Sequence, residues 1–90
     1  MVIIRGVIKS ISPPKTKRIS HRRVFAYLIF TIEDEQEKLY SVLIPDKIFR
    51  KSGFVPRVGH EVELEGYRSE PRYALVDYEV SRVKWIRRIG

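Results

Sequence analysis

The chain has 90 residues, of which 43% are hydrophobic and 32% are charged. A chain of this size buries roughly 60–65% of its unfolded surface in one core, so a single domain over residues 1–90 is expected. Its longest apolar run, Val24–Phe30, is far shorter than the ~20 residues of a membrane-spanning helix. The sequence has no cysteine for disulfides or thiolate metal sites. A cytoplasmic, non-secreted protein without a membrane partner is therefore expected.

Positive charge is concentrated in part of the sequence. Eighteen Lys and Arg residues against eleven Asp and Glu give a formal net charge of +7, and residues 1–32 contain no acidic residue at all. Such a surface attracts polyanions, although basic residues also serve solubility alone. The chain also has no Asn and only one Gln, which is a tendency of thermophilic proteins.

Segments rich in β-branched and aromatic residues alternate with Pro, Gly and charged breaks, which predicts an all-β domain. The expected strands are Val2–Ile11, Arg22–Glu33, Lys38–Ile44, Glu61–Tyr67 and Tyr73–Ile86. Asp46–Ser52 is expected to form one short helix, with Asp46 as its N-cap and Gly53 at its end. Residues 12–22, between the first two strands, are expected to form a loop.

The second predicted strand has the clearest alternation of side chains. Its core face is predicted to consist of Val24, Ala26, Leu28, Phe30 and Ile32. The opposite face then presents Arg23, Phe25 and Tyr27 to the outside. In Lys38–Ile44 either face could be buried, so the orientation of Tyr40 stays open.

The order of elements and two motifs resemble the OB-fold. Ile4–Ile8 resembles the first OB strand, in which a glycine allows a sharp bend, and Val58–Gly66 resembles the turn into the fourth strand. The family often has Asp where this chain has His60. The resemblance implies a five-stranded barrel with one short helix between strands 3 and 4. It is greatest to the single-stranded nucleic-acid-binding groups, such as replication protein A and bacterial single-strand-binding protein.

The resemblance also implies a ligand groove across strands 2 and 3, flanked by residues 12–22 and 68–72. Cations suited to phosphate contacts are Lys15, Lys17, Arg18, Arg22, Arg23, Arg68 and Arg72. Rings suited to base stacking are Phe25, Tyr27, Tyr40, Tyr67 and Tyr73. Tyr67 and Tyr73 could instead pair across a hairpin, and Trp85 is expected to cover one end of the barrel.

The expected function is non-catalytic binding of single-stranded DNA or RNA with low sequence specificity. The alternative is a small OB subunit that binds a protein partner within a larger nucleic-acid-processing complex. The sequence has no glycine-rich phosphate loop and no nucleophile elbow. His21 and His60 are too isolated to suggest zinc, and the acidic cluster at residues 33–37 is interpreted as a solvated turn. Neither enzymatic activity nor a metal or cofactor is expected.

Overall fold

A computed structural model describes residues 1–72 and 75–90 of the chain. The elements are β1 (Val2–Ile11), β2 (Lys15–Ser20), β3 (Arg23–Glu33), β4 (Leu39–Pro45), α1 (Asp46–Ser52), β5 (Glu61–Ser69) and β6 (Tyr78–Arg88). In the described part of the chain, no helix has the length and apolarity needed to cross a lipid bilayer.

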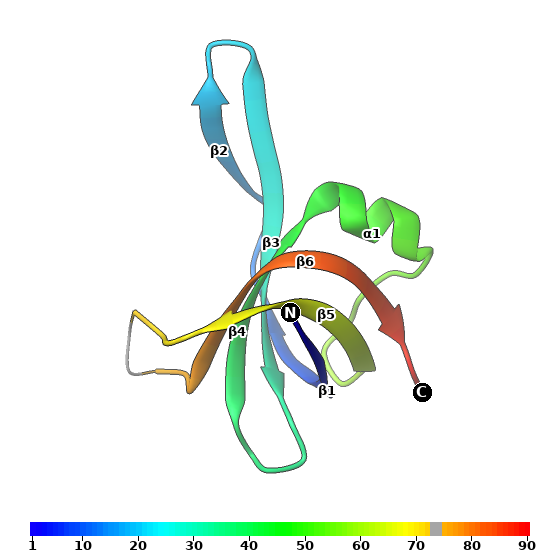
Figure 1. Cartoon of the computed structure of the whole chain (residues 1–90). Helices are drawn as coiled ribbons and strands as arrows, with labels where there is room; N and C mark the ends of the chain where they lie inside the picture. Colours follow the sequence, from blue (N-terminus) through cyan, green and yellow to red (C-terminus); the bar gives the residue numbers. More distant parts are fainter. Residues whose placement is uncertain (73–74) are drawn as a thin grey trace.

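The strands form a closed barrel of the OB-like type (Figure 1). The sheet order is β1-β5-β6-β4-β3-β2, and β1 also pairs with β3, which closes five of the six strands into a barrel. The β4–β6 pairing is parallel and the other pairings are antiparallel. The predicted all-β class is thereby confirmed, as is the short helix between the third and fourth strands of the barrel.

One strand was not predicted. Residues 15–20, expected to lie in a loop, form β2, which pairs with β3 from Lys15 opposite Tyr27 to Ser20 opposite Arg23. All six β2 residues are exposed, so the strand is held by backbone pairing and has no buried face. A strand without a buried face has no alternating hydrophobic pattern, which explains why the sequence did not reveal it. We call residues 15–27, which project beyond the barrel, the arm (Figure 1).

The core lies inside the barrel and begins only halfway along β3. Phe30 and Ile32 are fully buried, as predicted, and Ala26 and Leu28 are half-buried. The prediction for Val24 is wrong: its exposed fraction is 63%, because this part of β3 lies in the arm, beyond the barrel. Alternation along β3 therefore identified the correct face but not the length of strand over which that face meets the core.

The structure shows which face of β4 is buried, a question that the sequence left open. Tyr40, Val42 and Ile44 are buried in the core. Leu39, Ser41 and Leu43 consequently lie on the outer face.

The barrel closes where β1 crosses β3, and Gly6 permits the crossing. A Cβ atom at Gly6 would lie 2.7 Å from Ile32 Cγ2 and 2.9 Å from the carbonyl carbon of Glu33, and it would also overlap the Glu33 carbonyl oxygen. No side chain fits at these distances. The glycine is therefore required by the close approach of two backbones at this position.

Helix α1 packs against one end of the barrel. Its Ile48 is buried, and the Phe49 ring lies 5.1 Å from the Phe30 ring, centroid to centroid. Gly53, with φ of 75°, ends the helix as predicted. The prediction for Asp46 is wrong, because the N-cap is Pro45. Asp46 lies in the first turn, where it pairs with Arg50 at 2.8 Å.

Candidate nucleic-acid interface

A groove with a volume of about 900 Å³ runs between the arm and the β5–β6 connection. Its floor is the outer face of the barrel, where Ile29 of β3 and Leu43 of β4 lie side by side in the strand pairing. The lining residues are Lys17, Arg18, Ile19, Phe25, Tyr27, Ile29, Ser41, Leu43, Ser69, Glu70, Arg72, Glu79, Val80 and Ser81. Five of these were predicted site residues: Lys17, Arg18, Phe25, Tyr27 and Arg72.

Two aromatic rings line the arm side of the groove. Phe25 and Tyr27 are two residues apart on β3, so their side chains point to the same face. Their rings are stacked, with centroids 5.6 Å apart and planes inclined by 23°. Both side chains are half-buried, which leaves ring surface accessible from the groove. Together with Ile29, they form an apolar strip suited to flat partners.

Several cations lie on the arm near these rings. Lys17 lies opposite Phe25 in the β2–β3 pairing, and Lys15 lies opposite Tyr27, so both lysines share the face of the rings. Arg22 and Arg23 lie at the tip of the arm and are exposed. Of the predicted arm cations, Lys15, Arg22 and Arg23 are outside the groove lining, whereas Lys17 and Arg18 belong to it.

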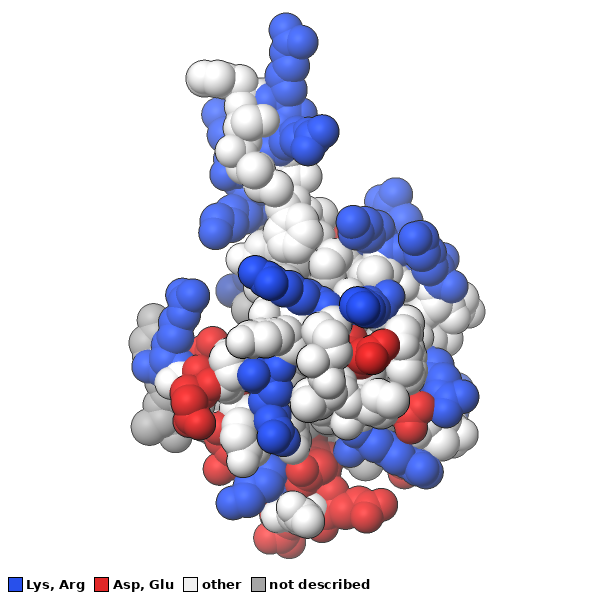
Figure 2. Space-filling view, in the orientation of Figure 1, with Lys and Arg blue, Asp and Glu red and all other residues white. Residues whose placement is uncertain are grey.

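The positive charge of the arm is uncompensated. The ion pairs of the described residues are Arg5–Glu61, Lys9–Glu33, Arg50–Asp46 and Arg87–Glu63, and none involves an arm residue. Figure 2 shows blue side chains along the projecting arm, while red side chains gather at the opposite end of this view. Like charges held together without counterions favour an anionic partner.

The wall opposite the arm is more polar and includes two carboxylates, Glu70 and Glu79. The backbone amide of Arg72 donates a hydrogen bond to Glu79 Oε1 at 3.1 Å, which ties the β5–β6 connection to β6. Three serines, Ser41, Ser69 and Ser81, complete this wall. Neither carboxylate was predicted to belong to the site. Glu70 lies in the predicted flanking segment, residues 68–72, of which only the cations were assigned. Glu79 is 54 residues from Phe25 in the chain, and only the barrel brings them to one groove.

Two predicted site residues lie at the barrel end instead of in the groove. Tyr40 is buried, and its ring stacks on the Tyr78 ring at a centroid distance of 5.3 Å. The guanidinium of Arg68 lies 4.7 Å from the centroid of Tyr78. The side chain of Arg68 therefore stabilises this aromatic pair and is directed away from the groove.

Hydrogen bonds fix Tyr40 in place. Its hydroxyl donates to Asp34 Oδ2 at 2.8 Å, while Asp34 Oδ1 accepts from the amides of Gln36 and Lys38. Burial raises the pKa of Tyr40, and the bond to Asp34 adds to this rise. Burial also acts to raise the pKa of Asp34, but its three hydrogen bonds outweigh that effect and hold the pKa below its ordinary value. Tyr40 is thus part of the β3–β4 turn and the core.

Tyr67, another predicted ring, is not among the residues that line the groove. Tyr67 is 51% exposed on the outer face of β5, and the Arg82 guanidinium lies 5.9 Å from its ring centroid. Tyr73 lies outside the described residues. Ser81, the strand partner of Tyr67, lines the groove, so Tyr67 lies just beyond its rim.

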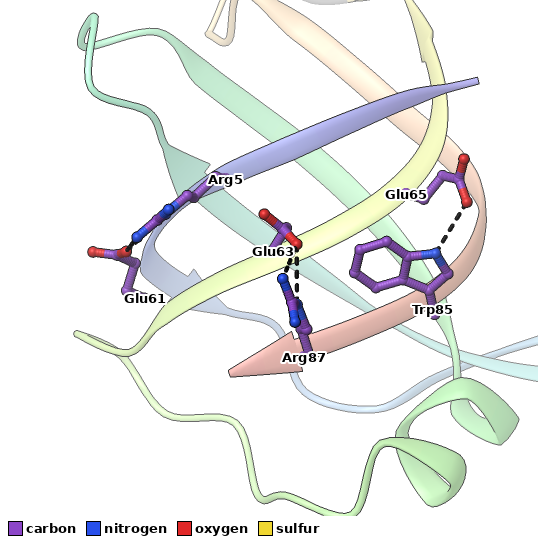
Figure 3. Close-up of polar contacts among 6 residues, drawn as sticks. All are labelled: Arg5, Glu61, Glu63, Glu65, Trp85 and Arg87. Carbon is purple, nitrogen blue, oxygen red and sulfur yellow. Dashed lines mark hydrogen bonds and ion pairs between the residues drawn. The ribbon is translucent and has the colours of Figure 1, made fainter. Parts of the chain in front are cut away.

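Trp85 was expected to cover one end of the barrel, but it does not. It is half-buried on the outer face of β6, and its indole Nε1 donates to Glu65 Oε1 at 3.0 Å (Figure 3). The same face carries the ion pairs Arg5–Glu61 at 2.8 Å and Arg87–Glu63 at 2.6 Å (Figure 3). These contacts link β1, β5 and β6 on a surface separate from the groove lining.

Comparison of the sequence with protein-family models and with curated proteins found no match. Evidence for a function therefore comes from the geometry of the groove.

Proposed function

We propose that the groove binds single-stranded DNA or RNA without catalysis and with low overall sequence specificity. The observation that carries this proposal is the arrangement of Phe25 and Tyr27, whose stacked rings face a groove flanked by arm cations that form no ion pair with any described residue. Stacking of a base on such a ring contributes about 1–3 kcal/mol and is tolerant of sequence. Lysine and arginine beside the rings would neutralise the phosphates that follow the bases.

The geometry favours single strands over duplexes. A duplex hides the faces of its bases, so it could use the cations of the arm but not the rings. The only helix in the described part of the chain, α1, has seven residues and packs on the barrel end. It therefore does not resemble a recognition helix that enters a major groove.

The test is a titration of labelled single-stranded DNA, single-stranded RNA and blunt duplex DNA of equal length, followed by fluorescence anisotropy. Single strands are expected to bind more tightly than the duplex. If roughly four arm cations contact phosphates, the slope of log K against log salt should be near −3. Equal affinity for single strands and duplex would overturn the stacking model. Failure of every oligonucleotide to bind at low salt would leave the protein-partner subunit as the better proposal.

A further inference from the structure

Glu79 places a carboxylate inside a groove that is otherwise suited to a polyanion. It lies on the outer face of β6, where the strand pairing sets it between Ser41 of β4 and Ser69 of β5. One of its oxygens accepts the hydrogen bond from the Arg72 amide, and the side chain is half-buried. The pairing on both sides and this bond fix the position of the carboxylate. If the groove binds a single strand, as proposed above, this fixed carboxylate lies where a nucleotide would pass.

The rings and Glu79 face different parts of the same groove. Thr31, Ser41 and Glu79 lie in one row across β3, β4 and β6, whereas Tyr27 lies four residues before Thr31 on β3. From strand spacing and residue rise, Tyr27 and Glu79 are about 16 Å apart. This distance exceeds the size of one base. A strand that stacks a base on Tyr27 would therefore present a different nucleotide to Glu79.

Charge determines which part of that nucleotide can approach Glu79. The arm side of the lining carries two cations, Lys17 and Arg18. The opposite wall carries one cation, Arg72, against the carboxylates of Glu70 and Glu79. A phosphate would therefore be attracted to the arm and repelled by the wall of Glu79. The base would therefore point toward Glu79 and the serines. An ionised carboxylate only accepts hydrogen bonds. It favours a base edge with an exocyclic amino group, as in cytosine, over thymine or uracil, which present a carbonyl oxygen at the same ring position.

We propose that Glu79 is a specificity-determining residue that selects an amino-bearing base at one position of the bound strand. The free oxygen of the carboxylate would accept the amino hydrogen, while the other oxygen keeps the Arg72 amide. This preference concerns a single nucleotide, so the rest of the groove remains tolerant of sequence.

The experiment compares oligo(dC), oligo(dT) and oligo(dU) of about 12 nucleotides, a length suited to one OB-type barrel. These pyrimidines have rings of one size and differ mainly on the edge proposed to face Glu79, where cytosine has an amino group and an unprotonated N3, and thymine and uracil have a carbonyl and an N3–H. At neutral pH the wild-type protein should bind oligo(dC) about five- to tenfold more tightly than either of the others. When a single cytosine replaces thymine at successive positions of oligo(dT), the affinity should rise most of the way to that of oligo(dC) at one position only.

Glu79→Gln is the decisive variant. Its amide oxygen can still accept the Arg72 hydrogen bond, and its amide NH₂ can donate to thymine, so the preference for cytosine should disappear. Glu35→Gln, which removes the same charge from the β3–β4 turn outside the groove lining, should keep the preference. Circular dichroism would establish that both variants are folded.

Two results would overturn the inference while leaving the proposed function intact. One is tight binding of all three oligonucleotides by the wild-type protein with equal affinity. The other is an unchanged ratio of oligo(dC) to oligo(dT) affinity in Glu79→Gln. Absence of binding to any oligonucleotide would instead refute the proposed function, and the inference with it.

Discussion

The indole of Trp85 donates a hydrogen bond of 3.0 Å to Glu65, on a face of the barrel that is separate from the groove lining. Trp85 is the only tryptophan in the chain. Its fluorescence should therefore report the integrity of the β5–β6 pairing and not the occupancy of the groove.

Emission from Trp85 should change on unfolding in urea but stay nearly constant when the protein is saturated with a single-stranded oligonucleotide. Trp85→Phe should retain affinity within about twofold, because Trp85 is not among the residues that line the groove. Strong quenching in proportion to bound oligonucleotide would show that the strand reaches this face.

The second prediction concerns the stacked rings. Phe25→Ala and Tyr27→Ala should each weaken single-strand binding by about 1–3 kcal/mol, since each removes one stacking surface. Neither should reduce the free energy of unfolding greatly, because both side chains are only half-buried and lie in the arm. Tyr67→Ala is the matched control, as it removes an exposed ring outside the groove lining. Wild-type affinity in both arm variants would refute the site assignment.

The third prediction concerns salt. The double variant Lys17→Ser, Arg18→Ser removes two groove cations, so the slope of log K against log salt should become less steep by about 1.4. Binding should be measured by anisotropy between low and physiological salt. Arg57→Ser, which removes one exposed cation outside the groove lining, should leave the slope unchanged. An equal loss of slope in both proteins would indicate a general charge effect.

The fourth prediction tests the closure of the barrel. Gly6→Ala should lower the free energy of unfolding by about 3 kcal/mol, because the new Cβ would overlap the backbone of Glu33 and the side chain of Ile32. Urea unfolding would measure the change. Gly90→Ala serves as the control, since a Cβ there meets nothing within 4 Å. A stability loss of similar size in both variants would contradict the steric explanation.

The fifth prediction concerns pH. Hydrogen bonds hold the pKa of Asp34 below its ordinary value of 3.8, so the ionised form stabilises the folded state above that pH. This contribution is lost as the pH falls through the lower, folded pKa. Asp34→Asn should therefore be less stable than the wild type near neutral pH, with a gap that narrows in acid below about pH 4. Urea midpoints measured across this range would provide the comparison.

Glu35→Gln is the control for this prediction. Glu35 lies in the same turn as Asp34, but its carboxylate accepts no hydrogen bond from the described residues. The change in the free energy of unfolding caused by Glu35→Gln should differ from that caused by Asp34→Asn in size and in pH dependence. A constant stability gap between wild type and Asp34→Asn at all pH values would contradict the assignment.

Local sequence signals predicted most of the fold. Val2–Ile11 and Asp46–Ser52 have the predicted bounds. The other predicted strands agree to within one or two residues at most of their ends, but the last strand begins at Tyr78 instead of Tyr73. These elements have a buried face or a specific terminator such as Gly53. Burial and backbone geometry leave a pattern in the sequence.

The residues that line the groove were predicted in part. Lys17, Arg18 and Arg72 line the groove, as do Phe25 and Tyr27. Tyr40 does not, because the register of its strand, which the sequence left open, turns its ring into the core against Tyr78. Arg68 does not either, because it belongs to β5 instead of the predicted loop, and its guanidinium lies over the Tyr78 ring.

The amino-acid sequence by itself determined the all-β class, the helix, the positive charge of the arm and the alternation that puts Phe25 and Tyr27 on one face. Each of these is a property of neighbouring residues. Only the tertiary structure decided that residues 15–20 pair as a strand, that Val24 is exposed, and that Glu79 shares a groove with Phe25. These outcomes depend on which strands pair and where the barrel ends, and both are fixed by contacts between residues far apart in the chain.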